Sequence, residues 1–327
     1  MRTEALARGI RAETLDAALS TLAEPLLIVL ERDRSQAEKE LTLEQYVARR
    51  LTPKLIASGH EMLAAHRPVL DEVSERYGVP AEIIAAVWGI ESNYGRFSGV
   101  RPTVAALATL AWDPRRSALF RSELFAALEI LDHGDVEVSR MRGSWAGAMG
   151  QVQFMPSSYL QYAQDFDNDG RRDIWSSPPD VFASIANFLK GHGWQTGQRW
   201  GLEVGVDAQL AEPFAEQVER GGGSCQARRD MKAMRSMAEW QRLGVRLPSG
   251  KDLPASEPDA ALVVGATRRF LVHANYDALL EYNCAHPYAI SVGLLAGTLN
   301  GSQALSRSNT RRAPKKAARR RRRHRHA

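Results

Sequence analysis

Apolar residues recur every three or four positions along most of this chain, which is the spacing of helices that bury one face. The helical spacing fills the chain up to about residue 76 and returns, bounded by Pro and Gly, at residues 79–94, 101–114, 115–134, 178–194 and 275–299. From about residue 198 the spacing changes, and residues 200–210 and 261–265 have the character of short strands. The sequence therefore predicts a mainly α (α+β) protein with a small strand-containing insertion.

One carboxylate interrupts the apolar face of the helix predicted at residues 79–94. Glu91 follows Ile84, Val87 and Trp88 by seven, four and three positions, so all four side chains share one face. A Glu on such a face lies at its edge, pairs with a buried Arg, or is a carboxylic acid whose pKa is raised by loss of water. An acid of the last kind keeps its proton near neutral pH and donates it to a leaving group, as in sugar-cleaving enzymes. Glu91 is therefore a candidate general acid.

The segment at residues 143–175 has the composition of a site for a polar, uncharged ligand. It is rich in Gly, Ser, Gln and aromatic residues and has few charges before residue 165. Gly lets the backbone approach a ligand, Ser and Gln hydrogen-bond hydroxyls and amides, and aromatic rings stack on sugars. The stretch GAMG lacks the spacing and the Lys of a phosphate-binding loop, so no nucleotide is predicted there.

Carboxylates crowd the end of this segment. Asp165, Asp167 and Asp169 stand at positions 1, 3 and 5 of an EF-hand-like loop, with Gly170 at position 6. These negative charges repel one another unless a cation offsets them. Position 12 is Ser176 instead of a bidentate Glu, so we expect a weak structural calcium site that sodium or magnesium could also fill. An N-capping acidic turn without a cation is the alternative.

Charge divides the chain into an acidic body and a basic end. Residues 306–327 hold 11 of the 43 Lys and Arg and no acidic residue, which leaves 32 basic against 38 acidic residues in residues 1–305. We expect the basic end to be disordered, because it has too few apolar residues to bury, with contact to a polyanion as the alternative. The acidic body offers no basic face, so specific nucleic-acid binding is not expected.

Cysteine content and the N-terminal sequence leave the cellular compartment open. Cys225 and Cys284 are compatible with one disulfide or with two thiols. The first 19 residues have the pattern of a charged amphipathic helix, and the apolar run at residues 25–30 is too short to span a bilayer. We therefore see no signal peptide in this sequence.

Five motifs, taken together, resemble one enzyme family. They are GIESNYG (89–95), LATLAWDPRR (107–116), GSWAGAMGQVQFMPSSY (143–159), DFDNDGRRDIW (165–175) and YNCAHPYAISV (282–292). In this order they are similar to the membrane-bound lytic murein transglycosylase B family, glycoside hydrolase family 103, over about residues 5–300. The resemblance implies a lysozyme-like helical core. It also implies an enzyme that cuts the MurNAc–GlcNAc β-1,4 bond of peptidoglycan and leaves 1,6-anhydromuramyl ends.

The resemblance also implies roles for single residues. Glu91 would act first as the catalytic acid and then as the base, without a cofactor. The residues implied to bind substrate are Ser144, Met149, Gln153, Tyr282, Asn283 and Tyr288. The residues implied to hold a structural calcium ion are Asp165, Asp167, Asp169, Asp180 and, through its backbone carbonyl, Arg171. Phe188 stands where relatives often carry Tyr, so a hydroxyl contact is not expected there.

These inferences divide the chain into five parts. We expect an N-terminal helical region (1–76), a catalytic core (77–197) with the acidic loop at 165–180, a small antiparallel β insertion (198–272), returning core helices (273–305) and the basic tail (306–327). A hydrolytic muramidase with the same fold and a non-catalytic peptidoglycan-binding module are the alternative functions. The family implies a monomer in the periplasm or cell envelope that acts on peptidoglycan strands.

Overall fold

The structure, a computed structural model, describes residues 1–20, 22, 24–35, 41–206 and 224–301. Within them the helices of the first half are α1 (Arg2–Ala7), α2 (Ala12–Leu19), α3 (Leu27–Ser35), α4 (Leu43–Arg50), α5 (Pro53–Ala65), α6 (Arg67–Tyr77), α7 (Ala81–Ser92), α8 (Thr103–Trp112) and α9 (Ser117–His133). The later helices are α10 (Pro156–Tyr162), α11 (Pro178–Gly191), α12 (Gln226–Asp230), α13 (Met237–Arg242), α14 (Ala274–Tyr282) and α15 (His286–Leu299). The predicted basic tail (306–327) and the end of the strand predicted at 200–210 lie outside the described residues.

Seven strands form two antiparallel sheets within the described part of the chain. A two-stranded ladder joins β1 (Arg101–Pro102) to β2 (Arg142–Gly143). The larger sheet has the order β4-β6-β7-β3-β5, and its strands are β3 (Gly201–Val206), β4 (Lys232–Arg235), β5 (Val245–Arg246), β6 (Ala260–Val264) and β7 (Arg269–Val272). In its centre Leu271 pairs with Leu202 on one side and with Leu262 on the other. These three side chains are part of a small hydrophobic core that also includes Trp240.

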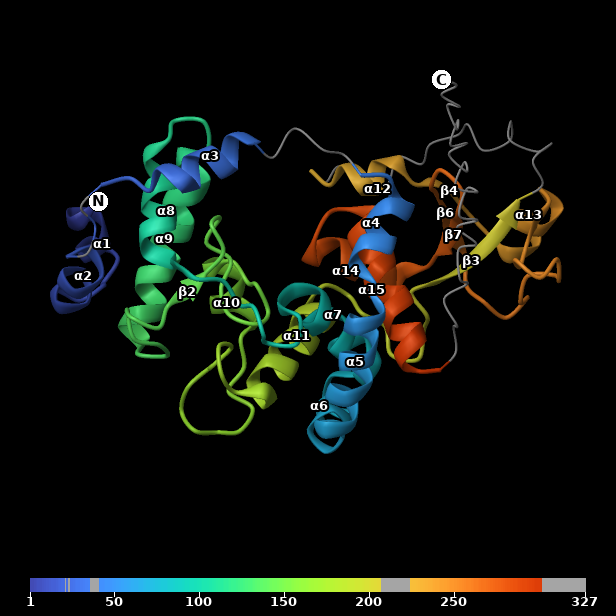
Figure 1. Ribbon diagram of the computed structural model, residues 1–327, viewed down its shortest axis with the longest axis horizontal. Helices are drawn as coiled ribbons and strands as arrows, with labels where there is room; N and C mark the ends of the chain where they lie inside the picture. The colour runs from blue at the N-terminus through green and yellow to red at the C-terminus, as the bar shows by residue number, and fades with distance from the viewer. Residues whose placement is uncertain (21, 23, 36–40, 207–223, 302–327) are drawn as a thin grey trace, which may run out of the picture.

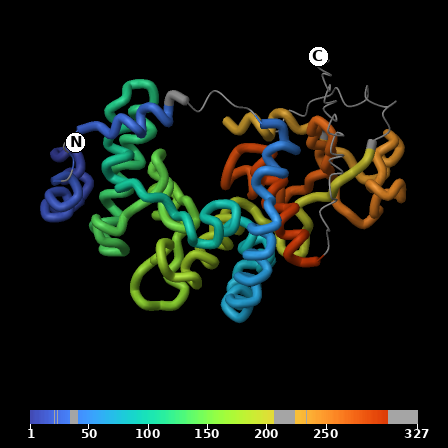
Figure 2. The backbone as a smooth tube through the Cα atoms, viewed as in Figure 1, coloured from blue at the N-terminus to red at the C-terminus, as the bar shows by residue number. Residues whose placement is uncertain are grey.

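Helix α7 lies at the centre of the molecule. It packs against α15, α5, α6 and α11 (Figure 1). Helices α1, α2, α3, α8 and α9 lie at one end and the five-stranded sheet at the other, as the backbone tube also shows (Figure 2). The helix-rich architecture confirms the fold class that the sequence predicts. The structure does not test the five-part division of the chain, which stays a prediction.

Helix α7 is buried on nearly every side, so its sequence is apolar almost all round. Of its twelve residues, ten are buried, and Glu82 and Glu91 are the exceptions. A helix of this kind belongs in the middle of a helical core. The helix predicted at 79–94 ends at Ser92, because Asn93 and Tyr94 adopt left-handed backbone angles with φ of 53° and 59°. The chain therefore turns sharply one residue after Ser92, just beyond Glu91.

Side-chain caps fix several helix starts. Thr42 and Gln45 form a reciprocal capping box at the start of α4, and Thr52 caps α5 ahead of Pro53. The helix predicted at 275–299 is divided in the structure, because Asn283 and Ala285 have extended backbone angles between α14 and α15. Within the described residues, no helix combines the length and the apolar composition that are needed to cross a bilayer.

A disulfide joins Cys225 to Cys284, with the two Cα atoms 5.6 Å apart. The sequence was compatible with either one disulfide or two thiols, and the structure contains the disulfide. The bond connects the residue before α12 to the short segment between α14 and α15. Arg228 of α12 strengthens the same connection through ion pairs with Asp277 (3.4 Å) and Glu281 (2.6 Å) of α14.

Candidate active site

Glu91 lies in the last turn of α7, where the central helix ends. Its side chain is partly exposed, whereas Trp88 and Ile90 beside it are buried. Burial raises the pKa of the Glu91 carboxyl to about 7, and the Tyr288 hydroxyl and the Arg50 charge oppose this rise. A carboxyl group with this pKa is partly protonated near neutral pH, so it can donate a proton in one step and accept one in the next.

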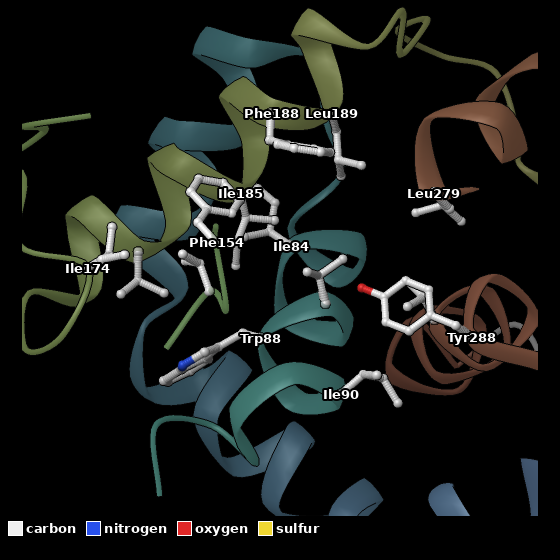
Figure 3. Packing of buried hydrophobic residues seen from close by; sticks show 14 of the residues in the cluster. Ile84, Trp88, Ile90, Phe154, Ile174, Ile185, Phe188, Leu189, Leu279 and Tyr288 are labelled. Carbon is white, nitrogen blue, oxygen red and sulfur yellow. The ribbon is translucent and has the colours of Figure 1, made fainter. Parts of the chain in front are cut away.

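Two tyrosines from the returning helices face this carboxyl. The ring of Tyr288, at the start of α15, points its hydroxyl toward α7 (Figure 3). That hydroxyl is buried and has no hydrogen bond of regular geometry to any described residue. The Tyr282 hydroxyl donates a hydrogen bond of 2.8 Å to the Val152 carbonyl oxygen. Burial raises the pKa of both tyrosines, and the nearby Glu91 charge raises it further. The predicted residues Glu91, Tyr282 and Tyr288 are therefore brought together.

The Gly-rich segment after β2 is a tight loop built on its own hydrogen bonds. The Ser144 hydroxyl accepts hydrogen bonds from the backbone N–H groups of Ala146 (3.2 Å) and Ala148 (3.1 Å). Gln153 has a left-handed φ of 53°, and its side-chain amide donates to the carbonyl oxygens of Gly150 (2.8 Å) and Ser98 (3.2 Å). Both side chains hold the loop in shape and stay partly exposed.

Met149 and Asn283 occupy two different environments. The side chain of Met149 is completely buried beneath the loop, where its backbone pairs with Phe154. Asn283 is exposed in the segment between α14 and α15. Phe188 is buried between the rings of Phe154 and Tyr282, at centroid distances of 5.3 and 4.7 Å. Its ring has no hydroxyl, so it packs against these rings without a hydrogen bond of its own.

A hollow of about 260 Å³ lies beside the loop. Its lining residues come from the segment after α7, the loop itself and α3; they are Ile28, Arg32, Phe97, Gly99, Val100, Arg101, Gly143, Ser144 and Trp145. Phe97 and Val100 are 64% and 60% exposed. Both side chains are apolar and line the same hollow, which gives it an apolar wall. Of the predicted site residues, only Ser144 lines this hollow.

The sequence missed three residues that shape the site. Tyr46 and Arg50 of α4 both interact electrostatically with Glu91, although they are about 40 positions away along the chain. Gln151 accepts a hydrogen bond of 2.7 Å from the Trp88 indole and donates one of 2.8 Å to the Trp175 carbonyl oxygen. It thereby ties α7 to the acidic loop. The sequence offered no signal for Tyr46 or Arg50, because their helix has an ordinary amphipathic pattern.

Two carboxylates that follow Glu91 in sequence are engaged elsewhere. Asp113 binds the Arg115 guanidinium, with a shortest distance of 2.9 Å. Asp132 accepts hydrogen bonds from Arg11 and Thr14 in the N-terminal helices. Neither interaction involves Glu91, so these two carboxylates are not its partners in the described part of the chain.

The acidic loop gathers three of its predicted ligands. Carboxylate oxygens of Asp165, Asp167 and Asp180 lie within 4.8 Å of one another. Asp180 is completely buried at the start of α11, where it accepts hydrogen bonds from the N–H groups of Phe166 (2.7 Å) and Asp173 (2.8 Å). Burial raises the pKa of Asp180 to about 6 against these hydrogen bonds, and the Asp167 charge raises it further. A set of hard oxygen donors with this mutual repulsion fits a calcium-sized cation.

Asp169 and Arg171 take part in the turn of this loop. The Asp169 N–H donates to Asp165 (3.1 Å), and the Asp169 carboxylate accepts from the Arg171 N–H (2.9 Å). Asn168 and Gly170 have left-handed φ angles of 59° and 89°, which gives the sharp bend expected near the middle of such a loop. The geometry thus brings Asp165, Asp167 and Asp180 together, with Asp169 and Arg171 beside them.

A family model described as "Transglycosylase SLT domain" matches residues 1–297 of this chain. The chain belongs to the transglycosylase SLT domain family. Membrane-bound lytic murein transglycosylase B of Escherichia coli is a relative that is 39% identical over 156 residues. This match covers 47% of the present chain and spans 43% of the relative's length.

Solved structures of the transglycosylase SLT family superimpose over most of the chain. SltB3 of Pseudomonas aeruginosa in complex with NAG-anhNAM-pentapeptide is 43% identical and has a TM-score of 0.83, with coverage of 92% of this chain and 77% of SltB3. Slt35 of Escherichia coli in complex with calcium is 27% identical and has a TM-score of 0.75, with coverage of 92% of this chain and 93% of Slt35. These matches confirm the predicted lysozyme-like helical fold.

Proposed function

We propose that this chain is a lytic transglycosylase that cleaves the β-1,4 bond between MurNAc and GlcNAc in peptidoglycan. The single observation that carries the proposal is Glu91, whose pKa is raised to about 7 at the end of the central helix. The chain that carries Glu91 belongs to a transglycosylase family. The complexes of SltB3 with NAG-anhNAM-pentapeptide and NAG-NAM-pentapeptide support the same substrate class.

Glu91 performs both proton transfers of this reaction. In the first step its carboxyl group protonates the glycosidic oxygen, and the bond from that oxygen to C1 of the muramyl sugar breaks. In the second step the Glu91 carboxylate takes the proton of the muramyl C6 hydroxyl while the C6 oxygen bonds to C1. The acid is regenerated and no water is consumed, so the product is a 1,6-anhydro sugar. The two-carboxylate arrangement of most glycosidases is not required.

The residues around Glu91 have supporting roles. Tyr282, Tyr288, Ser144, Gln153 and the exposed Asn283 present hydroxyl and amide groups that suit the hydroxyls and acetamido groups of the glycan. Met149 lies beneath them and supports the loop. A non-catalytic binding module would not need an acid with a raised pKa, so Glu91 favours the enzyme over that alternative.

The decisive test is the chemical nature of the product. Purified sacculi are digested with the protein, and the released muropeptides are analysed by mass spectrometry. We expect anhydromuropeptides, which are one water lighter than the products of hydrolysis. Hydrated ends would identify the protein as a muramidase, and intact sacculi would leave only a binding function.

The site of action and the cation are parts of the same proposal. A peptidoglycan substrate implies action in the periplasm or cell envelope, and the Cys225–Cys284 disulfide fits an oxidising compartment. We propose that the protein acts there as a monomer. Asp165, Asp167 and Asp180, with Asp169 and the Arg171 carbonyl, would hold a calcium ion, which would stabilise the loop and take no part in bond cleavage. The calcium complex of Slt35 supports this proposal.

A further inference from the structure

The carboxylate of Glu44 connects α4 to the five-stranded sheet. Its Oε1 atom accepts hydrogen bonds from the backbone N–H groups of Thr267 (2.7 Å) and Arg268 (2.9 Å) in the turn between β6 and β7. Burial would raise the pKa of Glu44, but hydrogen bonds from backbone N–H groups of this turn and of Glu44 itself lower it to about 2. The carboxylate is therefore ionised at all working pH values and binds the turn as a fixed anion.

The other side of the same helix faces the candidate active site. Tyr46 and Arg50 are four positions apart and share one face of α4, whereas Glu44 lies two and six positions before them, on a different side. Leu43 and Val47 are buried in the contact of α4 with α15. Figure 1 shows α4 alongside α15, with the sheet beyond. The helix is thus held between the sheet and the site.

We propose that Glu44 is a positioning residue that holds α4 against the turn between β6 and β7, so that Arg50 and Tyr46 face Glu91. The strand-containing segment then contributes to the site although its strands carry none of the proposed catalytic or binding residues. This proposal rests on the proposed role of Glu91. The turn is itself anchored, because Arg268 makes two hydrogen bonds of 2.7 Å to Glu203 on β3.

Glu44 can change the pKa of Glu91 only through the charged and titratable groups that face Glu91. They are Arg50 and Tyr46 from α4, Tyr282 from α14 and Tyr288 from α15. Arg50 is the cation among them and lowers the pKa of Glu91. Loss of the Arg50 charge by itself raises the pKa of Glu91, so a displacement of α4 that leaves the Glu91 carboxyl buried moves the alkaline limb of the activity profile to higher pH. The same displacement removes Tyr46 from the cleft.

A double-mutant cycle with Arg50 tests the proposal. The variants are Glu44→Ala, Glu44→Gln, Arg50→Met and Glu44→Ala combined with Arg50→Met, assayed as kcat/KM against pH on soluble glycan strands. We expect Glu44→Ala to lower kcat/KM by roughly three- to tenfold and to move the alkaline limb upward. The Gln variant keeps an oxygen that accepts the two N–H groups, so it should recover most of the loss. When Arg50 has already been replaced by Met, Glu44→Ala should cause no further shift of the alkaline limb.

Glu239→Ala is the matched control, because it also removes a carboxylate that accepts a backbone N–H group in the sheet region (from Ser236, 3.0 Å), without touching α4 or the turn between β6 and β7. It should lower the melting temperature and leave the alkaline limb in place. Hydrogen exchange of the segment at residues 41–50 gives a readout apart from activity, and it should rise in Glu44→Ala and not in Glu239→Ala. Additive effects of Glu44→Ala and Arg50→Met, unchanged exchange in α4, or a limb that moves to lower pH would each overturn the proposal. If Glu91 were not the catalytic acid, a separate experiment would show it, because Glu91→Gln would then keep full activity.

Discussion

At the scale of the residue, the behaviour of Glu91 is set by its position and not by its type. The same residue type at Glu44 has a pKa lowered to about 2, whereas Glu91 has a pKa raised to about 7. Backbone N–H groups surround the first, and apolar and aromatic side chains surround the second. Donors stabilise the ionised form and loss of water destabilises it, so Glu44 is an anion at neutral pH whereas Glu91 is partly protonated there.

Replacing Glu91 by Gln should abolish cleavage of sacculi. The amide keeps the shape of the side chain but cannot donate the proton, and general acid catalysis contributes about 10²–10⁴-fold or more. Muropeptide release by the purified variant, measured by chromatography at neutral pH, checks this. Binding of sacculi in a pull-down should persist as the control for folding. Activity above a tenth of the wild-type value would remove Glu91 from its proposed role.

The pH dependence of stability should carry the signature of a raised carboxyl pKa. The ordinary value is 4.5 and the folded value is about 7. Below pH 4.5 the acid is protonated in both states. Between these two values the unfolded chain loses its proton while the folded chain keeps it, so stability falls as pH rises through this window. The stability of Glu91→Gln should not fall in this window, because Gln has no proton to lose.

We therefore expect Glu91→Gln to be more stable than the wild type at pH 8 by roughly 1–3 kcal/mol, and about equally stable at pH 4. Urea unfolding at both pH values measures the difference. The cleavage rate of the wild type should fall on the alkaline side with a midpoint near pH 7, because the acid loses its proton there. A variant that is less stable than the wild type at pH 8 would contradict the raised pKa.

At the scale of the element, the acidic loop before α11 should act as a cation-dependent brace. A cation that binds only the folded state adds RT ln(1 + [L]/Kd), about 2.7 kcal/mol at a hundredfold excess over Kd. Calcium should therefore raise the melting temperature, as measured by scanning calorimetry with calcium and with chelator. Asp165→Asn combined with Asp167→Asn should remove that increment, because both carboxylates lie in the group of three.

Asp252→Asn is a suitable control for this experiment. Asp252 is an exposed carboxylate that pairs with Arg246 at 3.3 Å in the sheet region, far from the loop in sequence. Its removal should leave the calcium increment intact. Cleavage at low temperature should change little in the loop variant, since the cation has no step in the reaction. Immediate loss of cleavage on chelation, without a change in melting temperature, would show a catalytic ion instead.

At the scale of the whole molecule, the disulfide closes a long loop that contains β4, β5, β6 and β7. Cys225 and Cys284 are 59 positions apart, and a closed loop of this length restricts the unfolded chain strongly. Cys225→Ser combined with Cys284→Ser should lower the free energy of unfolding by about 2–4 kcal/mol. Chemical denaturation measures the loss. Dithiothreitol should reproduce it in the wild type and have no effect on the double variant, whereas equal stability of all forms would exclude a structural role for the bond.

The packing of the whole molecule also explains why a helical enzyme carries a sheet. The sheet buries its own core around Trp240 and Leu271. It contacts α4 through Glu44, and the chain beside β4 is bonded to the α14–α15 segment through the disulfide. Two walls of the candidate cleft are thus attached to one rigid unit. Rigid support of this kind is what precise placement of an acid requires.

The sequence by itself predicted most of the helices, the family and a candidate acid. Helical spacing located α7, α8, α9 and α11, because one buried face leaves a period of 3.6 residues in the chain. Glu91 stood out as a charge on an apolar face, and the acidic loop by its alternating carboxylates. The motifs resembled the right family because each is a continuous stretch. All of these signals are local, because each comes from residues that are close together in the sequence.

The tertiary structure decided everything that depends on residues far apart in sequence. It brought Tyr46 and Arg50 to Glu91, tied Gln151 to Trp88, and paired Cys225 with Cys284. It divided the helix predicted at 275–299, so that Asn283 lies in an extended segment. A pKa of about 7 is likewise a property of the packed site, because desolvation comes from side chains on other helices. Such contacts leave no periodic trace in a single sequence, so only the folded chain could show them.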